Sequence, residues 1–278
     1  MRGEASRLAD RSSRDLMASK IQALGSEAGK LAEQMFTLCD VLDANPRLQR
    51  AMTDPGRPVE DKKKLVRTLM GEQAMPITLE ILDDLVARSW SRAYDIDNAV
   101  EDFGVDAVMY EADSRGQTLQ ISVELAKLQS ALLNLPVVRS SLSGSNGVTA
   151  EARVELLHKL IDNAHFDKMT VKLAEHAAAN PRKRRFVETL QWLISKFSRH
   201  MGESMVTVTT ATPLNDEQIQ RLIDVYTKKL GRKAFIHCVV DPSVLGGMRV
   251  QVGDEVTDRT VVAQLENLQR MAKVSFGE

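Results

Sequence analysis

The chain has 278 residues, of which 43% are hydrophobic and 27% charged, and this is the composition of a globular protein long enough for two or three domains. Its 37 basic and 38 acidic residues give a net charge of −1, so no overall field draws the chain toward nucleic acid or an anionic membrane. Only Cys39 and Cys238 are present, no secretory segment opens the chain, and no apolar run reaches the ~18 residues of a membrane span, so we expect a cytoplasmic protein that does not itself cross a bilayer.

Helical periodicity dominates residues 1–114. Apolar residues return every three or four positions and trace one face, at Leu24, Ala28, Leu31, Met35, Leu38 and Leu42. Prolines lie between such segments, where a fixed φ and a missing N–H start or end a helix, at Pro46, Pro55, Pro58 and Pro76. These residues therefore predict an N-terminal helical domain.

The polar stretch "EADSRGQTLQ", residues 111–120, interrupts this pattern and is either a loop or a weak point in a long helix. We place a domain boundary here and expect a second helical unit over 115–202. Shifted by 90 positions, "TLCDVLDANPRLQRAM" from Thr37 matches "KLQSALLNLPVVRSSL" from Lys127 in pattern, and later segments match after two single-residue insertions. Duplication of a unit of roughly 90 residues and chance similarity between amphipathic bundles both explain this, and we favour duplication.

From Glu203 the period changes from helical to alternating, which predicts a small α/β domain over 203–278. A strand in "MVTVTTATPL" precedes a helix that begins at Asn215 or Asp216 and ends at Gly231. Two further strands, "AFIHCVVD" and "GGMRVQVGD", precede a closing helix from Asp258. The predicted fold class is α+β, predominantly α-helical, with helical bundles followed by a short mixed sheet.

The segment "VVDPSVLGGMRVQVGDEVTD", residues 239–258, combines aspartates with glycines, which is compatible with a metal site or with tight corners of a sheet. The spacings of common metal sites, H-E-x-x-H and D-x-D-x-D-G, do not occur in the chain. We therefore expect no metal and no cofactor. Structural roles in turns and caps are assigned to Pro213, Asp241, Pro242, Gly246, Gly247, Gly253, Asp254 and Asp258.

Other candidate sites have ordinary explanations. "PRKRRF", residues 181–186, lacks interleaved aromatic residues and is interpreted as a solvated helix start, not a nucleic-acid site. The histidines are scattered, with no paired acid nearby in sequence. A phosphate-binding loop, G-x-x-x-x-G-K-[ST], and the catalytic signature G-x-S-x-G are both missing, so we expect neither ATP binding nor catalysis.

The C-terminal quarter resembles the ATP synthase delta subunit family, whose mitochondrial member is the oligomycin sensitivity conferral protein. The matching motif positions are Thr210, Ala211, Pro213, Leu214, Asp241, Pro242, Ser243, Leu245, Gly246, Gly247, Gly253, Asp254 and Asp258. Thr260 stands where serine is commoner in the family. The room for an additional helical unit resembles the enlarged actinobacterial form.

The resemblance implies a non-catalytic stator subunit of an F-type, proton-translocating ATP synthase, peripheral to the cytoplasmic face of the bacterial plasma membrane. In the family, the helical domain receives N-terminal helices of the alpha subunits and the C-terminal domain holds b-type stalk subunits. Leu173, Ala177 and Phe186 form a candidate receiving surface, although each is equally compatible with internal core. Two other hypotheses are a helical-repeat adaptor unrelated to energy conversion, and an enzyme with a pocket between the helical and α/β parts.

Overall fold

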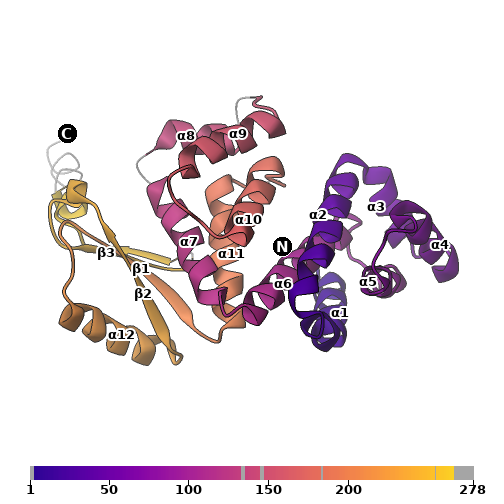
Figure 1. The fold of residues 1–278 in the computed structure, drawn as a ribbon, viewed down its shortest axis with the longest axis horizontal. Coiled ribbons are helices and arrows are strands. Elements are labelled where there is room, and N and C mark those ends of the chain that lie inside the picture. Colours follow the sequence, from indigo (N-terminus) through magenta and orange to yellow (C-terminus); the bar gives the residue numbers. More distant parts are fainter. Residues whose placement is uncertain (1–2, 133–134, 145–146, 183, 254, 266–278) are drawn as a thin grey trace, which may run out of the picture. The chain divides into compact units, whose positions relative to one another are not determined.

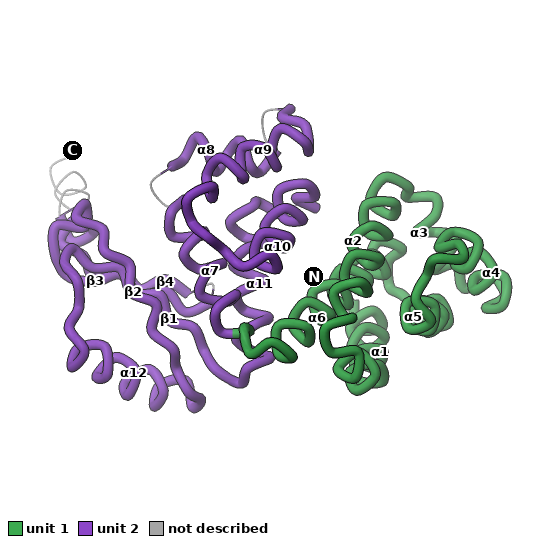
Figure 2. Tube along the Cα trace, viewed as in Figure 1, with its two compact units in different colours: residues 1–118 green, residues 119–278 purple. Residues whose placement is uncertain are grey.

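The computed structural model describes residues 3–132, 135–144, 147–182, 184–253 and 255–265. The chain forms two compact units, residues 1–118 and 119–278 (Figure 2). Helices dominate, and a small mixed sheet lies near the C-terminal end of the described chain, which confirms the predicted α+β class (Figure 1). No single described helix has the length and apolarity of a membrane span, although by those criteria alone the bent pair of helices 118–131 and 136–142 qualifies.

The first unit is built around one long helix. Its elements are α1 (Glu4–Gln22), η1 (Gly25–Glu27), α2 (Ala28–Ala44), α3 (Pro46–Thr53), α4 (Val59–Met70), α5 (Pro76–Ala87) and α6 (Tyr94–Ser114). Helix α6 is buried along most of its length and packs against α1, α2 and α3. The predicted apolar face is the buried face of α2, but Leu24 lies outside this helix because the chain turns at Gly25, where φ is +54°. Leu24, which the spacing placed on the same face as Ala28, therefore precedes the turn and is not part of the helix.

Three of the four prolines begin helices, as predicted. Pro46 and Pro76 are the first residues of α3 and α5, and Pro58 is the N-cap of α4. At a first helical position the missing N–H removes no intrahelical hydrogen bond, so proline starts the helix without weakening it. Pro55 lies in the loop before α4.

The second unit begins directly after a short turn. Helix α6 ends at Ser114, Gly116 has φ of +64°, and α7 begins at Thr118. The helices of this unit are α7 (Thr118–Ala131), α8 (Pro136–Leu142), α9 (Ala150–Ile161), α10 (Lys168–Ala179) and α11 (Phe186–His200). The same compact unit also contains the sheet, so a boundary at residue 202 between separate domains stays a prediction.

The helices of the two units recur in the same order. Helices α2 to α6 correspond to α7 to α11, and α4, α5, α9 and α10 all have 12 residues. The two short helices α3 and α8 both begin with proline, after residues of nearly the same backbone conformation, φ −129° and ψ 76° at Asn45 and φ −120° and ψ 65° at Leu135. This recurrence favours duplication over chance.

A side-chain hydrogen-bond arrangement recurs as well. In the first unit Gln34 Oε1 accepts the Met75 N–H at 3.0 Å and the buried Thr78 hydroxyl at 2.6 Å. At the corresponding positions of the second unit, Glu124 Oε2 accepts the Asp167 N–H at 2.9 Å and the buried Thr170 hydroxyl at 2.5 Å. One acceptor thus fixes the start of the fourth helix in each repeat, and the repeat extends to individual contacts.

Replacing Glu124 should separate the need for an acceptor from the need for a charge. We expect Glu124→Gln to cost less than about 1 kcal/mol of unfolding free energy, because the first repeat uses glutamine for the same bonds. Glu124→Ala should cost about 2 to 3 kcal/mol, because it leaves a buried hydroxyl and an N–H without their acceptor. Denaturant unfolding measures both, and equal losses would refute the acceptor role.

The C-terminal part of the second unit is a four-stranded mixed sheet with one crossover helix. Its elements are β1 (Ser204–Thr210), α12 (Asp216–Leu230), β2 (Ala234–Val240), η2 (Pro242–Val244), β3 (Met248–Val252) and β4 (Glu255–Asp258), and the strand order is β2-β1-β3-β4. Strand β1 is parallel to β2, in register Val206 to Ile236, and antiparallel to β3, in register Val208 to Val250. Asn215 caps α12 through a reciprocal bond with Gln218.

The two faces of this sheet pack against different helices. Val206, Val208, Ala234, Ile236 and Val250 form a buried cluster against the apolar face of α12. On the opposite face, α11 contacts β1, and Gln251 of β3 donates to Gln191 of α11 at 2.8 Å. Alternation of side chains along each strand therefore gives both faces a partner.

Strand β4 was not predicted from the sequence. It pairs with β3 in register Val252 to Glu255, and Gly253, directly after β3, has φ of +59°, which favours a tight turn. Asp254, the other predicted turn residue, lies outside the described residues. The strand was missed because all four residues of β4 are exposed, so the segment shows no alternation of buried and exposed side chains.

Candidate functional site

The loop between β2 and β3 is shaped by the residues that the sequence singled out. Asp241 Oδ1 accepts the Ser243 N–H at 2.9 Å, so this carboxylate starts the short η2 helix at Pro242. Gly247 has φ of +74°, and a Cβ at this position would lie 2.3 Å from the Arg259 carbonyl oxygen. Backbone bonds from Val261 N to Gly246 O and from Arg259 N to Met248 O hold the segment after β4 against the loop. In the structure these residues position backbone.

Asp258 holds the residue that caps the closing helix and does not itself cap that helix. It accepts the backbone N–H and the hydroxyl of Thr260 at 3.0 and 2.7 Å, and Arg249 Nε at 2.7 Å. Burial raises the pKa of Asp258, but the bonds from Thr260 and Arg249 outweigh this effect and lower it overall. Thr260 itself caps the following helix, because its hydroxyl accepts the Ala263 N–H at 3.2 Å. The prediction that Asp258 is the direct cap is therefore corrected to Thr260.

Exposed apolar side chains occur at several described positions of the α/β part of the second unit. They are Val225, Val240, Leu245, Met248, Val256, Val261 and Leu265, between 37% and 69% exposed. Leu245 and Val261 are neighbours in space, because Val261 is bonded to Gly246. This pair is a candidate contact for a partner, because adjacent exposed apolar side chains favour burial against another protein.

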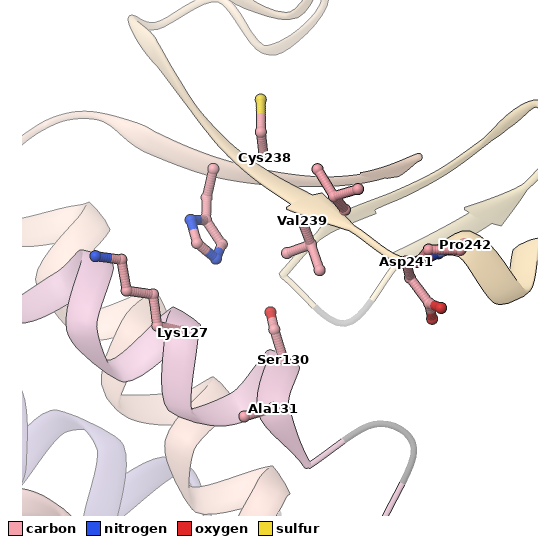
Figure 3. A pocket seen from close by; sticks show the side chains of 9 residues that line it. Lys127, Ser130, Ala131, Cys238, Val239, Asp241 and Pro242 are labelled. Atoms are coloured by element: carbon pink, nitrogen blue, oxygen red, sulfur yellow. The ribbon is translucent and has the colours of Figure 1, made fainter. Parts of the chain in front are cut away.

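A cavity of about 410 Å³ lies between α7 and the end of β2. Figure 3 shows Lys127 and Ser130 of α7 facing the strand, and Cys238 pointing away from α7. His237 also lines this cavity, is 8% exposed, and its Nε2 has no hydrogen-bond partner among the described residues. Burial, and secondarily the charge of Lys127, lower the pKa of His237. The cavity therefore favours a neutral imidazole.

This histidine should make stability depend on pH. Because the pKa of His237 is lower in the folded chain than in the unfolded chain, its contribution is present above the unfolded pKa of about 6.5 and is lost as pH falls through the folded value. We expect the urea midpoint of unfolding to decrease as the pH is lowered from about 7.5 to about 5.5. His237→Leu should make the midpoint less dependent on pH over this range. Urea titrations at several pH values test this, and an unchanged slope in the variant would assign the dependence to other groups.

A second groove, of about 390 Å³, lies between α8 and the start of α11. It is lined by Pro136, Arg139, Ser140, Ser143, Arg185, Val187 and Glu188. The neighbouring Val137 is 75% exposed. Ser143 joins the two helices, because its hydroxyl accepts the Phe186 N–H at 3.2 Å. The groove thus combines apolar side chains with two arginines.

The three residues suggested for a receiving surface are inside the bundle. Leu173, Ala177 and Phe186 are all 0% exposed, on α10 and α11. In this conformation they are core, which was the second explanation of their periodicity. A direct role for them in binding stays a prediction that requires the bundle to open.

The basic run at residues 181–186 is less solvated than predicted. Arg182 is 8% exposed, and Arg184 stacks on Trp192 with 4.5 Å between the guanidinium and the ring centroid. Among the described arginines of the run, only Arg185 is exposed. Within the part of the chain that the structure describes, no three His, Cys, Asp or Glu side chains are grouped to hold a metal ion.

Residues 105–271 match the family model described as ATP synthase delta (OSCP) subunit, which covers more than half of the chain. The chain belongs to this family. "ATP synthase subunit delta" of Bifidobacterium animalis subsp. lactis is 64% identical over all of both chains, and that of Bifidobacterium adolescentis is 61% identical over 99% of this chain and 100% of that one. A chain of a Toxoplasma gondii mitochondrial ATP synthase structure aligns at 20% identity with a TM-score of 0.35, over 60% of this chain and 94% of that one, which is too low to support a conclusion.

Membership of the delta subunit family makes the chain a structural, non-catalytic peripheral-stalk subunit of an F-type ATP synthase, peripheral to the membrane-bound complex. It decides for the stator hypothesis and against an adaptor unrelated to energy conversion. The full-length match to bifidobacterial relatives also confirms the enlarged actinobacterial form. Because the family match begins at residue 105, it includes α7 to α11 and the sheet, whereas α1 to α5 precede it. The family model thus matches the second helical unit and not most of the first.

Proposed function

We propose that α7 to α11 bind N-terminal helices of the alpha subunits, that the α/β part binds b-type stalk subunits, and that this link lies at the cytoplasmic face of the plasma membrane. The observation that carries the proposal is the extent of the family match, which spans both parts together. A stator needs two separate attachment surfaces, and the second unit offers a groove on its helical part and exposed apolar side chains on its α/β part.

The apolar surface of the α/β part supports a stalk-binding role. Each ion that crosses the membrane releases about 2.3 kcal/mol per 100 mV, and the stator must hold while several such steps accumulate. A nanomolar attachment is only about 12 kcal/mol, and exposed ion pairs contribute little of it. Leu245, Val261 and their exposed apolar neighbours therefore suit a helix of a stalk subunit better than a purely charged surface would.

The groove between α8 and α11 supports a head-binding role for the helical part. Val137 and Pro136 offer apolar contact at its edge, and Arg139 and Arg185 offer charge. An amphipathic helix that enters such a groove presents apolar residues at helical spacing and polar residues toward the rim. The core behind the groove, which includes Phe186, holds its walls in place.

Pull-down of the complex with a tag on this chain tests the two attachments separately. Leu245→Glu together with Val261→Glu should reduce recovery of b-type subunits by at least about fivefold and leave alpha recovery unchanged, because charge opposes apolar burial. Val137→Glu should reduce alpha recovery and leave b-type recovery unchanged.

Val225→Glu is the control for one added charge at an exposed apolar position of the same unit outside the Leu245 and Val261 pair, because Val225 lies on α12 and is 54% exposed. Loss of both subunits in every variant would indicate misfolding and not a surface effect. Recovery of both subunits at the wild-type level by all variants would contradict the proposed surfaces.

A further inference from the structure

The first unit contains a shallow groove of about 740 Å³ that lies outside the two surfaces proposed above. Its lining residues are Arg50, Ala51, Thr53, Asp54, Pro55, Gly56, Arg57, Pro58, Trp90, Ser91, Arg92 and Ala93. They come from the last turn of α3, the loop before α4 and the segment before α6. Trp90 Nε1 donates to the Leu85 carbonyl oxygen at 2.9 Å, which fixes the indole ring as one wall.

Three exposed arginines in this groove lack an acidic partner among the described residues. Arg50 Nε contacts only the Pro46 carbonyl oxygen of its own helix, at 3.3 Å, and the side chains of Arg57 and Arg92 have no ion pair. The single carboxylate in the lining, Asp54, accepts the Gly56 N–H at 2.9 Å. The groove therefore has a surplus of positive charge in a chain whose net charge is −1.

Two helices also direct their N-terminal ends into this groove. Pro58 and Ala93 are the N-caps of α4 and α6, and neither helix has a side-chain cap bond. The first turns of these helices carry four carboxylates, Glu60, Asp61, Asp95 and Asp97. Glu60 pairs with Lys63 at 3.1 Å, Asp61 pairs with Lys64 at 3.7 Å, and the buried Asp95 accepts the Ser6 hydroxyl at 2.7 Å. The two helix starts therefore already have acidic side chains near them, and the attraction of the groove for a negatively charged ligand rests on the arginines.

The second repeat has a basic groove at the corresponding place. This is the groove between α8 and α11, and three of its lining residues occupy positions equivalent to lining residues of the first groove. The equivalent pairs, first repeat before second, are Arg50 and Ser140, Thr53 and Ser143, and Ala93 and Arg185. The arginines themselves come from different positions, because the second repeat uses Arg139 and Arg185. The second groove also contains Glu188, which pairs with Arg185 at 3.9 Å, so the surplus of unpaired arginines is larger in the first repeat.

We propose that the arginine groove of the first unit binds an acidic polypeptide segment of a partner protein. Guanidinium groups match carboxylates in geometry, and three of them from separate segments suit a row of Asp or Glu side chains. Trp90 and the two prolines provide apolar contact for the side chains between those acids. A single phosphate is a poorer fit, because the groove is open and its only glycine, Gly56, already donates its N–H to Asp54.

Binding to the intact chain tests this proposal. The probe is a fluorescent peptide in which glutamate alternates with alanine and leucine, and the test variant combines Arg50→Gln, Arg57→Gln and Arg92→Gln. We expect about a tenfold rise in Kd, which corresponds to three exposed charge pairs. The matched control combines Arg7→Gln, Arg11→Gln and Lys64→Gln, which removes the same charge from exposed positions of the same unit that do not line the groove, and should change Kd less than about twofold.

Carbodiimide coupling in the purified ATP synthase identifies the partner segment. Arg57→Lys keeps the charge and supplies an amine that the reagent joins to a contacting carboxylate, and Arg11→Lys is the control. A crosslink from position 57, but not from position 11, to an Asp- or Glu-rich segment of another subunit supports the proposal. Equal loss of peptide affinity in both triple variants, competition by inorganic phosphate or RNA stronger than by the peptide, or no peptide binding to the wild-type chain would overturn it. None of these outcomes depends on which unit binds the head.

Discussion

Gly247→Val should destabilise the α/β part by more than about 3 kcal/mol, because two effects coincide at this position. A β-branched residue is strained at a φ of +74°, and the new Cβ would lie 2.3 Å from the Arg259 carbonyl oxygen and 3.1 Å from the Thr260 Cα. These neighbours are backbone atoms of the segment that leads into the closing helix, so they cannot rotate away. Thermal and denaturant unfolding of the full chain measure the loss, and recovery of b-type subunits should fall with it.

Two other glycines separate the contributions. Gly231→Ala places a side chain at φ of +67° with no atom within 4 Å, so it isolates backbone strain and should cost about 1 kcal/mol. Gly246, at φ of +157°, would bring a Cβ to 3.3 Å from the Val261 side chain, and the effect of Gly246→Val should lie between the two. If Gly247→Val were no worse than Gly231→Ala, the close approach to Arg259 would not be a constraint.

Arg14→Met should destabilise the first unit by about 2 to 4 kcal/mol. Arg14 of α1 makes a two-pronged bond to Asp106 of α6, at 2.5 Å from Nε and 2.7 Å from Nη2, and the Asp106 side chain is only 8% exposed. Burial lowers the pKa of Arg14, but the charges of Asp106 and Asp102 outweigh this effect and raise it overall. Removing the guanidinium leaves a buried carboxylate without its main partner. The Arg14 side chain is 34% exposed, so water limits the loss.

The double variant Arg14→Met with Asp106→Leu is the control, because it removes both charges and keeps the volume. We expect it to recover at least about half of the loss, as replacement of a buried ion pair by apolar side chains often does. Equilibrium unfolding of the wild type and the three variants gives the coupling energy. An Asp106→Leu variant as unstable as Arg14→Met, with no recovery in the double variant, would show that packing and not charge pairing holds α1 on α6.

The elements of the α/β part were predictable where residue type and backbone requirement coincide. Asn215, Gly231, Gly247 and Gly253 each satisfy a local condition, a cap or a positive φ, that the neighbouring sequence reveals. Strand β4 escaped prediction because its formation depends on pairing with β3 and not on a buried face of its own. Local signals therefore located the turns better than the last strand.

The candidate surfaces were harder to predict, because periodicity cannot tell the core of a bundle from a groove. Leu173, Ala177 and Phe186 repeat at the right spacing for either, and only packing in three dimensions places them inside. The basic groove of the first unit joins Arg50, Arg57 and Arg92, which are distant enough in sequence to show no common motif. The repeat, by contrast, was visible in the sequence, and the matching bonds of Gln34 and Glu124 now support it at atomic detail.

The central position of β1 has a mechanical consequence. The chain passes from α11 through residues 201–203 straight into β1, which is paired along its length with β2 on one side and over residues 206–210 with β3 on the other. Tension drawn along this strand loads both ladders in shear, so many hydrogen bonds resist together instead of opening one after another. The sheet is therefore most resistant to unfolding when force is transmitted from α11 along β1.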